Sequence, residues 1–163
     1  MKDCIVNGDC LELLRSLPAE SVDLVVSSPP YNIGKAYEAK RELQTYLDEQ
    51  KAVLRECHRV LKPNGSIFWQ VGSFTHKGTL VPLDVKLFPI LEELGMLPRN
   101  RIIWVRQHGL HASKKFSGRH ETILWFTKGD EFYFDLDAVR VPQKWQNKKS
   151  HRGDKKGELS CNP

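Results

Sequence analysis

Apolar residues follow two kinds of spacing along the first hundred residues, and each kind predicts a different element. Apolar runs of about 4–8 residues are typical of buried strands, and such runs occur at 3–7, 22–26 and 66–72. Apolar residues three or four positions apart predict amphipathic helices, and this spacing occurs at 10–17, 44–61 and 83–94. Because residues 22–26 are apolar at nearly every position, we expect a strand that is buried on both faces.

Turns and later strands complete this pattern. The Lys-Pro-Asn-Gly segment 62–65 predicts a turn after the long helix. Residues 101–106 and 121–127 predict two more strands. Residues 131–135 predict a further short strand, which pairs with 121–127 through a Lys-Gly-Asp turn. Strands that alternate with helices indicate a parallel sheet, whereas strands close together in sequence indicate antiparallel pairing. We therefore expect an α/β fold with a Rossmann-like, mostly parallel sheet, flanking helices and an antiparallel pair at one edge.

The strand at 22–26 ends in an unusual segment, Ser28-Pro29-Pro30-Tyr31. Binding sites of open α/β sheets form at the carboxyl ends of strands. Two prolines stiffen this end and remove two N–H donors, so the backbone there presents mainly carbonyl oxygens. The hydroxyl of Ser28 is a further acceptor, and the ring of Tyr31 offers a stacking surface worth about 1–3 kcal/mol per base. The alternative interpretation is a rigid proline turn with a packed tyrosine.

These groups suit a flat heterocycle that carries an exocyclic amino group. Two acceptors that draw on both amino hydrogens pull the nitrogen lone pair out of conjugation with the ring, so the amine becomes a better nucleophile. A base inside a duplex is out of reach of such a site and has to be flipped out of the helix. The segment therefore indicates an enzyme that acts on a nucleobase.

Charge and composition narrow the class of protein. The net charge is +5, and residues 141–163 contribute six basic and two acidic side chains, or +4 of it. This basic tail fits contact with DNA, although on charge alone a solvated, poorly ordered terminus is the favoured interpretation. We divide the chain into a catalytic part, 1–140, and this tail. The four cysteines lack metal-ligand spacing and no apolar stretch reaches a membrane-spanning length, so we expect no metal, no membrane contact and a cytoplasmic location.

Four segments of the chain resemble the amino-methyltransferases of DNA. They are N-G-D-C-L-E-L-L at 7–14, V-D-L-V-V-S-S-P-P-Y-N at 22–32, R-V-L-K-P-N-G-S-I-F-W at 59–69 and R-H-E-T-I-L-W-F-T-K at 119–128. That family uses S-adenosylmethionine to methylate adenine N6 or cytosine N4 in double-stranded DNA. The order of segments is that of the circularly permuted subgroup, in which the catalytic half comes first and the cofactor-binding half comes later.

The resemblance implies roles for individual residues. Ser28, Pro29, Pro30 and Tyr31 match the catalytic loop, where Ser28 and Pro29 also meet the cofactor, and Asp9 matches the acidic residue that contacts the cofactor's adenine. The residues expected to contact the nucleotide or DNA are Asn32, Lys35, Lys114, Lys115 and Arg119, with Gly34, Lys40, His111 and Phe116 as further candidates. His120 and Glu121 are expected to shape the pocket. Trp69, Trp104 and Trp125 lie in apolar strands, so we expect them in the core.

The chain departs from that family in one respect. The family's second motif, D-P-F-x-G-S-G-T, is absent, and no G-x-G occurs. The chain therefore resembles an incomplete fold, for which we consider a truncated protein, one subunit of a split enzyme and a degenerate remnant. Missing central strands would leave unpaired edges and exposed apolar faces, so we expect a partner chain that carries the glycine-rich motif, or self-association.

Three functions are weighed against these observations. The first is a DNA amino-methyltransferase or its catalytic half, with cytosine N4 slightly favoured by Ser28 while Asn32 points to adenine. The second is a non-catalytic DNA-binding or targeting subunit, which the basic tail and the missing motif fit. The third, methylation of a protein amide, requires a glycine motif upstream of the prolines, and we do not expect it because only about eight residues precede Asp9 in this sequence.

Overall fold

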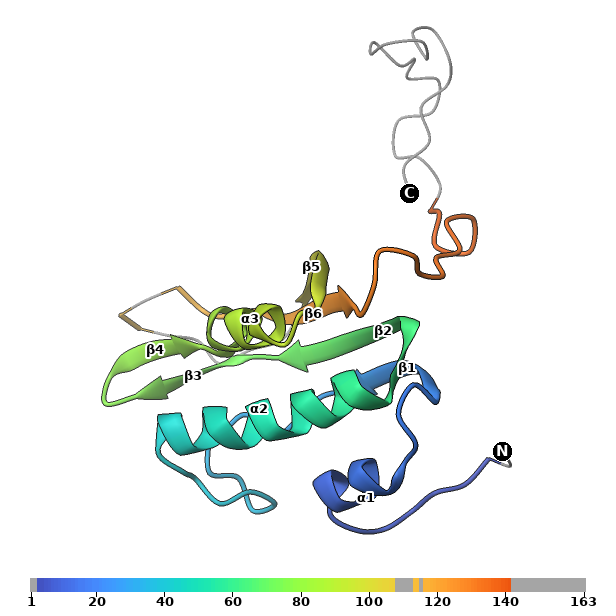
Figure 1. Cartoon of the computed structure of the whole chain (residues 1–163). Coiled ribbons are helices and arrows are strands. Elements are labelled where there is room, and N and C mark those ends of the chain that lie inside the picture. Colours follow the sequence, from blue (N-terminus) through green and yellow to red (C-terminus); the bar gives the residue numbers. More distant parts are fainter. Residues whose placement is uncertain (1–2, 108–112, 115, 142–163) are drawn as a thin grey trace, which may run out of the picture. The chain divides into compact units, whose positions relative to one another are not determined.

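A computed structural model describes residues 3–107, 113–114 and 116–141 (Figure 1). The chain forms two compact units, 1–132 and 133–163. In the described part of the second unit, residues 133–141, Asp135 accepts a hydrogen bond from the backbone of Ala138, and Arg140 pairs with Asp137 at 2.6 Å. None of the helices in the described ranges has the length and apolar character that a membrane crossing requires.

The first unit is built on a four-stranded sheet with the order β1-β2-β6-β5. The strands are β1 (Val22–Ser27), β2 (Leu61–Val71), β5 (Leu97–Val105) and β6 (His120–Thr127). Strands β1 and β2 are parallel, whereas β6 is antiparallel to both β2 and β5. The expected α/β class and the antiparallel pair at one edge are confirmed, but the parallel part of the described sheet is only the β1–β2 pair.

Three helices and a hairpin complete the described part of the first unit. The helices are α1 (Cys10–Ser16), α2 (Leu43–Val60) and α3 (Leu83–Glu93), close to the predicted bounds. The hairpin joins β3 (Ser73–His76) to β4 (Thr79–Pro82) and was not predicted. Its two-residue turn, Lys77-Gly78, has positive φ at both positions, which matches the twist of antiparallel strands.

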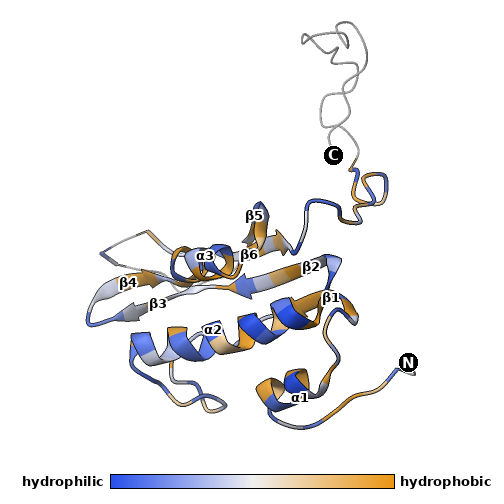
Figure 2. Ribbon diagram, viewed as in Figure 1, coloured by the Kyte–Doolittle hydropathy of each residue, from blue (hydrophilic) through white to orange (hydrophobic). Residues whose placement is uncertain are grey.

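The core lies on one face of the sheet, between the strands and helices α2 and α3. Side chains on this face alternate along β2 and β6, and Ile67, Trp69, Leu124 and Phe126 are all buried. Phe88 of α3 packs edge-on against Phe126 at 4.9 Å between ring centroids. Helix α2 carries both hydrophobic and hydrophilic residues (Figure 2), as expected for a helix with one face on the core.

The opposite face of the sheet is largely uncovered in the described residues. Leu24 and Val26 of β1 are 52% and 70% exposed, and Trp104 of β5 is 52% exposed. The predicted strand at 22–26 is therefore correct, but its predicted burial on both faces is wrong. The prediction that three tryptophans are core residues holds for Trp69, whereas Trp125 is half-buried and Trp104 is not in the core.

Three further sequence predictions were wrong. Residues 3–7 form no strand. Ile5 is fully exposed, and β1 is an edge strand of the described sheet, with β2 as its neighbour. Residues 62–65 do not form a separate turn after the helix, because they belong to β2. The register of the β1–β2 pairing shifts here, between Val22 and Leu24. Residues 131–135 do not pair with β6, because the ring of Phe132 turns onto Trp125, 5.5 Å away, and beneath the guanidinium of Arg99.

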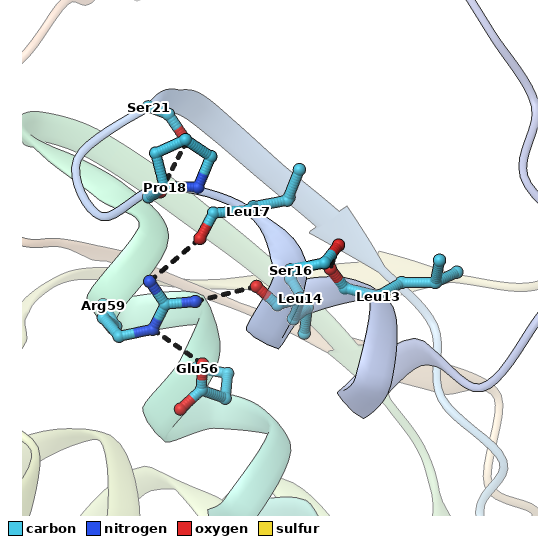
Figure 3. Close-up of polar contacts among 8 residues, drawn as sticks. All are labelled: Leu13, Leu14, Ser16, Leu17, Pro18, Ser21, Glu56 and Arg59. Atoms are coloured by element: carbon cyan, nitrogen blue, oxygen red, sulfur yellow. Dashed lines mark hydrogen bonds and ion pairs between the residues drawn. The ribbon is translucent and has the colours of Figure 1, made fainter.

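Arg59, near the end of α2, fixes the chain that leads into β1. Its guanidinium donates to the carbonyls of Leu14 and Leu17 at 2.8 and 3.0 Å and pairs with Glu56 at 2.7 Å (Figure 3). The half-buried guanidinium thus donates to two carbonyls at the end of α1, of which the Leu14 carbonyl also accepts from the backbone N–H of Leu17. These contacts tie α1 to α2 and set where β1 begins.

Candidate functional site

The predicted catalytic segment follows β1 directly and borders an open cleft. The cleft has a volume of about 470 Å³, within the range of about 300–1,000 Å³ typical of small-molecule sites. Its lining residues are Ser28, Pro29, Pro30, Tyr31, Lys35, Tyr37, Gln70 and Glu121. The structure therefore brings the four predicted catalytic residues together with Lys35 at the end of the parallel strand pair, where sites of α/β sheets form.

A network of hydrogen bonds connects Ser28 to strand β6. The Ser28 and Tyr31 hydroxyl oxygens are 3.1 Å apart, and the Tyr31 hydroxyl donates to Glu121 Oε2 at 3.2 Å. Gln70 Nε2 donates to the same carboxylate oxygen at 2.5 Å, and Arg106 pairs with the other oxygen at 2.9 Å. Glu121 is nearly buried, so its carboxylate organises donors from three segments of the chain.

The phenol of Tyr31 keeps its proton at neutral pH. Burial is the largest cause of its raised pKa, and the negative charge of Glu121 raises that pKa further, while the hydrogen bond with Ser28 lowers it. A phenolate beside the Glu121 carboxylate would place two negative charges in a partly buried site. Tyr31 therefore acts here as a neutral ring with one hydrogen to donate.

Gly72 gives the Tyr31 ring its place beside the sheet. A Cβ atom at position 72 would lie 3.0 Å from Cε2 and 3.1 Å from Cδ2 of Tyr31. Such contacts are tighter than side chains normally allow, so a larger residue here would displace the ring. Gly72 follows the last residue of β2, and the ring edge thus packs directly on the backbone at the strand end.

The diproline corner is held by helix α2. The hydroxyl of Tyr46 donates to the carbonyl oxygen of Pro30 at 2.8 Å. Tyr46 is buried in the core, and burial is the main cause of its raised pKa, followed by the nearby Glu38 and Tyr31. Breaking this contact would leave the buried Tyr46 hydroxyl without a hydrogen-bond partner, which is costly. The helix therefore fixes the position of the corner.

Asn32 closes the loop that follows the corner. It has a positive φ of 60° and is buried, and its side-chain amide exchanges hydrogen bonds of 2.8 and 2.7 Å with the backbone of Arg41. The backbone N–H groups of Asn32 and Ile33 donate to the carboxylate of Glu38. In this structure Asn32 positions the loop, and its predicted contact with the nucleotide stays a prediction.

Sequence reasoning missed two residues of the cleft. Tyr37 is 69% exposed at the cleft, with Lys35 Nζ 5.7 Å from its ring centroid. It lies in a loop without periodicity, where no sequence pattern distinguishes a site residue from a solvated one. Gln70 did carry a signal, since it is a polar residue near the carboxyl end of the otherwise apolar strand segment 66–72.

The other predicted site residues lie outside the set that lines the cleft. Asp9 caps α1, where one carboxylate oxygen accepts from the backbone N–H groups of Leu11 and Glu12 at 2.9 and 3.0 Å. Lys114 and Arg119 are exposed, and Arg119 donates to the Gln107 carbonyl. Lys115, like His111 and most of the basic tail, lies outside the described residues.

The described residues hold no cluster of three side chains suited to bind a metal ion. Of the cysteines, Cys4 and Cys10 are exposed free thiols, whereas Cys57 is a buried one. Burial raises the pKa of the Cys57 thiol to about 12, so it stays protonated and serves as an apolar core residue.

Solved structures define the class to which this fold and cleft belong. The chain superposes on PvuII DNA methyltransferase (cytosine-N4-specific) with a TM-score of 0.67 and 25% identity, over 90% of this chain and 57% of that one. It also superposes on a putative DNA modification methylase from Thermus thermophilus, complexed with S-adenosyl-L-methionine, with a TM-score of 0.63, 29% identity, and 80% and 55% coverage. The fold is therefore that of S-adenosylmethionine-dependent methyltransferases.

Sequence comparison then identifies the family. The DNA methylase profile for N6 and N4 methylation matches residues 22–162, so the chain belongs to this family. Type II methyltransferase M.BglII of Bacillus subtilis is 61% identical over 98% of this chain and 44% of its own length. DNA adenine methyltransferase YhdJ of Escherichia coli K12 is 36% identical over 86% of this chain and 46% of its own length. The chain thus spans about half the length of these relatives.

Proposed function

We propose that this chain carries the base-binding and catalytic part of a DNA methyltransferase that modifies an exocyclic amino group. The observation that carries this proposal is the open cleft at the end of β1, which is lined by Ser28, Pro29, Pro30 and Tyr31. A packed corner would leave no room for a planar guest beside Tyr31. Membership in the N6 and N4 DNA methylase family supports the same function.

The chain's own residues act on the amino group. Ser28 Oγ and the carbonyl oxygen of Pro29 are the acceptors for its two hydrogens, since the Pro30 carbonyl already accepts from Tyr46. The Tyr31 ring stacks on the flipped base and holds it in the plane of these acceptors. Positioning and preorganised acceptors provide the rate acceleration, so the mechanism needs no strongly basic side chain.

The cofactor is S-adenosylmethionine, which supplies the electrophilic methyl group when bound. The donors and acceptors present fit such a cation, because the cleft carries the Glu121 carboxylate and the acceptors of Ser28 and Pro29. We assign these two cleft residues and Asp9 to cofactor binding, with Asp9 at the cofactor's adenine. The methionine end would need a glycine-rich segment, and this chain has none.

We favour cytosine N4 over adenine N6 by a small margin. A hydroxyl at position 28 is a weaker acceptor than the carboxylate that adenine enzymes of this family usually carry there. The structural similarity to the cytosine-N4-specific PvuII enzyme agrees with this choice. The relative YhdJ, whose name specifies adenine, points the other way, so the product has to be measured.

A second segment completes the molecule. The exposed apolar side chains of Leu24, Val26 and Trp104 lie on the sheet face that no described helix covers. The relatives are about twice as long as the matched region. We propose that a glycine-rich cofactor-binding half, in the later position of the permuted order, covers this face, either in the same polypeptide or as a partner chain. Double-stranded DNA is the substrate, and we place the reaction in the cytoplasm.

Transfer of a tritiated methyl group to DNA tests the role of the cleft. The assay uses the methylation-competent protein, meaning this chain with any segment or partner that completes it. Tyr31→Ala should abolish transfer while leaving the thermal midpoint within a few degrees, because Tyr31 is only half-buried. Tyr133→Ala, which removes an 81% exposed tyrosine of the second unit, is the matched control. Full activity of Tyr31→Ala would contradict the proposal.

A non-catalytic subunit is the second candidate function. The observation that favours it is the absence of a glycine-rich cofactor motif from the sequence. Calorimetric titration with S-adenosylmethionine, with and without the complementing half, separates the two functions. Heat of binding in the completed protein supports the catalytic role, and no binding in either sample supports the non-catalytic one.

A further inference from the structure

Glu121 is the acidic residue among those that line the cleft, and the proposed function gives it no part in making the amine reactive. Its carboxylate meets the Tyr31 hydroxyl, the Gln70 amide and the Arg106 guanidinium at 3.2, 2.5 and 2.9 Å. A carboxylate has no hydrogen to donate. Every one of these contacts must therefore run toward Glu121.

This requirement fixes the direction of the next hydrogen bond. Tyr31 has one hydroxyl hydrogen, which it gives to Glu121 Oε2. The contact of 3.1 Å between the Tyr31 and Ser28 hydroxyls has no direction of its own. Because the Tyr31 hydrogen is already used, the hydrogen in this contact must come from Ser28. The order is Ser28 to Tyr31 to Glu121.

We infer that Glu121 is a positioning residue that makes Ser28 a hydrogen-bond acceptor toward the substrate amine, and this inference rests on the proposed function. With its hydrogen turned to Tyr31, Ser28 Oγ presents only lone pairs to the cleft that it lines. An amino group brings hydrogens and needs acceptors, so this is the productive orientation. A serine hydroxyl that pointed its hydrogen into the cleft would repel the same amine.

Glutamine at position 121, the neutral analogue of glutamate, can reverse the direction of these hydrogen bonds. In Glu121→Gln, the amide oxygen turns toward the Arg106 cation, and the amide NH2 then faces Tyr31. The Tyr31 oxygen would accept from this NH2, and its own hydrogen would turn to Ser28. The Ser28 hydrogen is then released into the cleft. Because the residues are nearly isosteric, the substitution changes hydrogen-bond direction with little change in packing.

Turnover measurements on the completed protein test this inference. Preorganised groups of this kind are typically worth tenfold or more in kcat. We expect Glu121→Gln to lower kcat at least about tenfold, with the KM for DNA and the thermal midpoint unchanged. Glu92→Gln, an exposed glutamate on the last turn of α3, is the matched control and should keep wild-type turnover. Wild-type kcat in Glu121→Gln would overturn the inference, whereas an inactive wild type would overturn the proposed function as well.

A carboxylate at position 28 is an acceptor in any orientation, so Ser28→Asp should remove the need for Glu121. In that background we expect Glu121→Gln to change kcat less than about threefold, and an undiminished loss would contradict the inference. Neutron diffraction from the deuterated protein gives a readout that needs no activity. A Ser28 deuteron directed at Tyr31 supports the proposed order, and one directed into the cleft overturns it.

Discussion

At the scale of single residues, the candidate site depends on how tightly Tyr31 is held. Its hydroxyl lies between Ser28 and Glu121, and its ring edge rests on the backbone at Gly72. A ring fixed at both ends can present a defined stacking surface without first paying the entropy of ordering a mobile side chain. The precision of this placement leads to a prediction at Gly72.

Gly72→Ala should displace the Tyr31 ring by a few tenths of an ångström and lower turnover. A misplacement of about 1 Å can cost about a hundredfold, so we expect a loss of about three- to tenfold in kcat. Gly118→Ala is the control, since a Cβ there would meet nothing within 4 Å. Steady-state methylation rates of the two variants test this prediction, and equal rates would show that the position of the Tyr31 ring is not critical.

The segment of neighbouring site residues could be predicted from the sequence, but the contacts between distant segments could not. Ser28, Pro29, Pro30 and Tyr31 are consecutive, so their chemistry could be read from one segment. The contact between Tyr31 and Glu121 joins residues 90 positions apart, and nothing in either segment specifies it. The buried hydrogen bonds between Asn32 and Arg41 were not predictable, because they depend on a loop conformation that has no sequence pattern.

At the scale of elements, helix α2 holds the diproline corner near its start and the end of α1 near its own end. Near its start, Tyr46 holds the Pro30 carbonyl, and near its end, Arg59 holds the carbonyls of Leu14 and Leu17. The predicted helix at 44–61 was confirmed because its apolar spacing is long and regular. The roles of Tyr46 and Arg59 were not predictable, since their partners lie on other elements.

Arg59→Ala should destabilise the fold by about 1–3 kcal/mol, because it leaves two carbonyls and the half-buried Glu56 without their charged donor. Urea unfolding followed by circular dichroism measures this change. Arg55→Ala is the matched control on the same helix, where the side chain is exposed. An equal free energy of unfolding for the two variants would mean that the Arg59 contacts contribute nothing.

His58, the neighbour of Arg59, makes stability depend on pH. Burial, and secondly the positive charge of Lys128, lower its pKa below the ordinary value of 6.5. The unfolded chain therefore binds this proton more readily than the folded chain. The stability that neutral His58 contributes is present above about pH 6.5 and is lost as the pH falls through the lower pKa of the folded state.

Urea unfolding at about pH 7.5 and about pH 5.5 tests this effect. Wild-type protein should lose more unfolding free energy on acidification than His58→Gln, which cannot take up the proton. The same loss in both proteins would exclude His58 as the cause. Because other groups titrate in both proteins alike, the comparison isolates the contribution of this one side chain.

At the scale of the whole molecule, the asymmetry of the sheet is the main finding. One face carries α2, α3 and the core, while the other exposes Leu24, Val26 and Trp104. The existence of most strands was predictable from apolar runs. Their order and direction were not, since strand pairing is set by contacts between distant segments, and the expected parallel share of the sheet was therefore too large.

We expect the proposed second half to bind to the sheet face that carries Leu24, Val26 and Trp104. Val26→Lys places a charge on this face and should weaken binding of the complementing half at least about tenfold, because burial of an unpaired charge is costly. Leu80→Lys, at a similarly exposed site on the β3–β4 hairpin, should bind as the wild type does. Titration followed by light scattering measures both affinities. Unimpaired binding of Val26→Lys would show that the second half does not use this face.

The central claim is that the cleft beside Tyr31 makes a nucleobase amine reactive. Its most direct test is to methylate DNA with the completed protein, digest the DNA to nucleosides and identify the product by mass spectrometry. The claim predicts a methyl group on an exocyclic nitrogen, N4-methylcytosine or N6-methyladenine, and none with Tyr31→Ala. A methyl group on a ring carbon, or an unchanged yield with Tyr31→Ala, would contradict it.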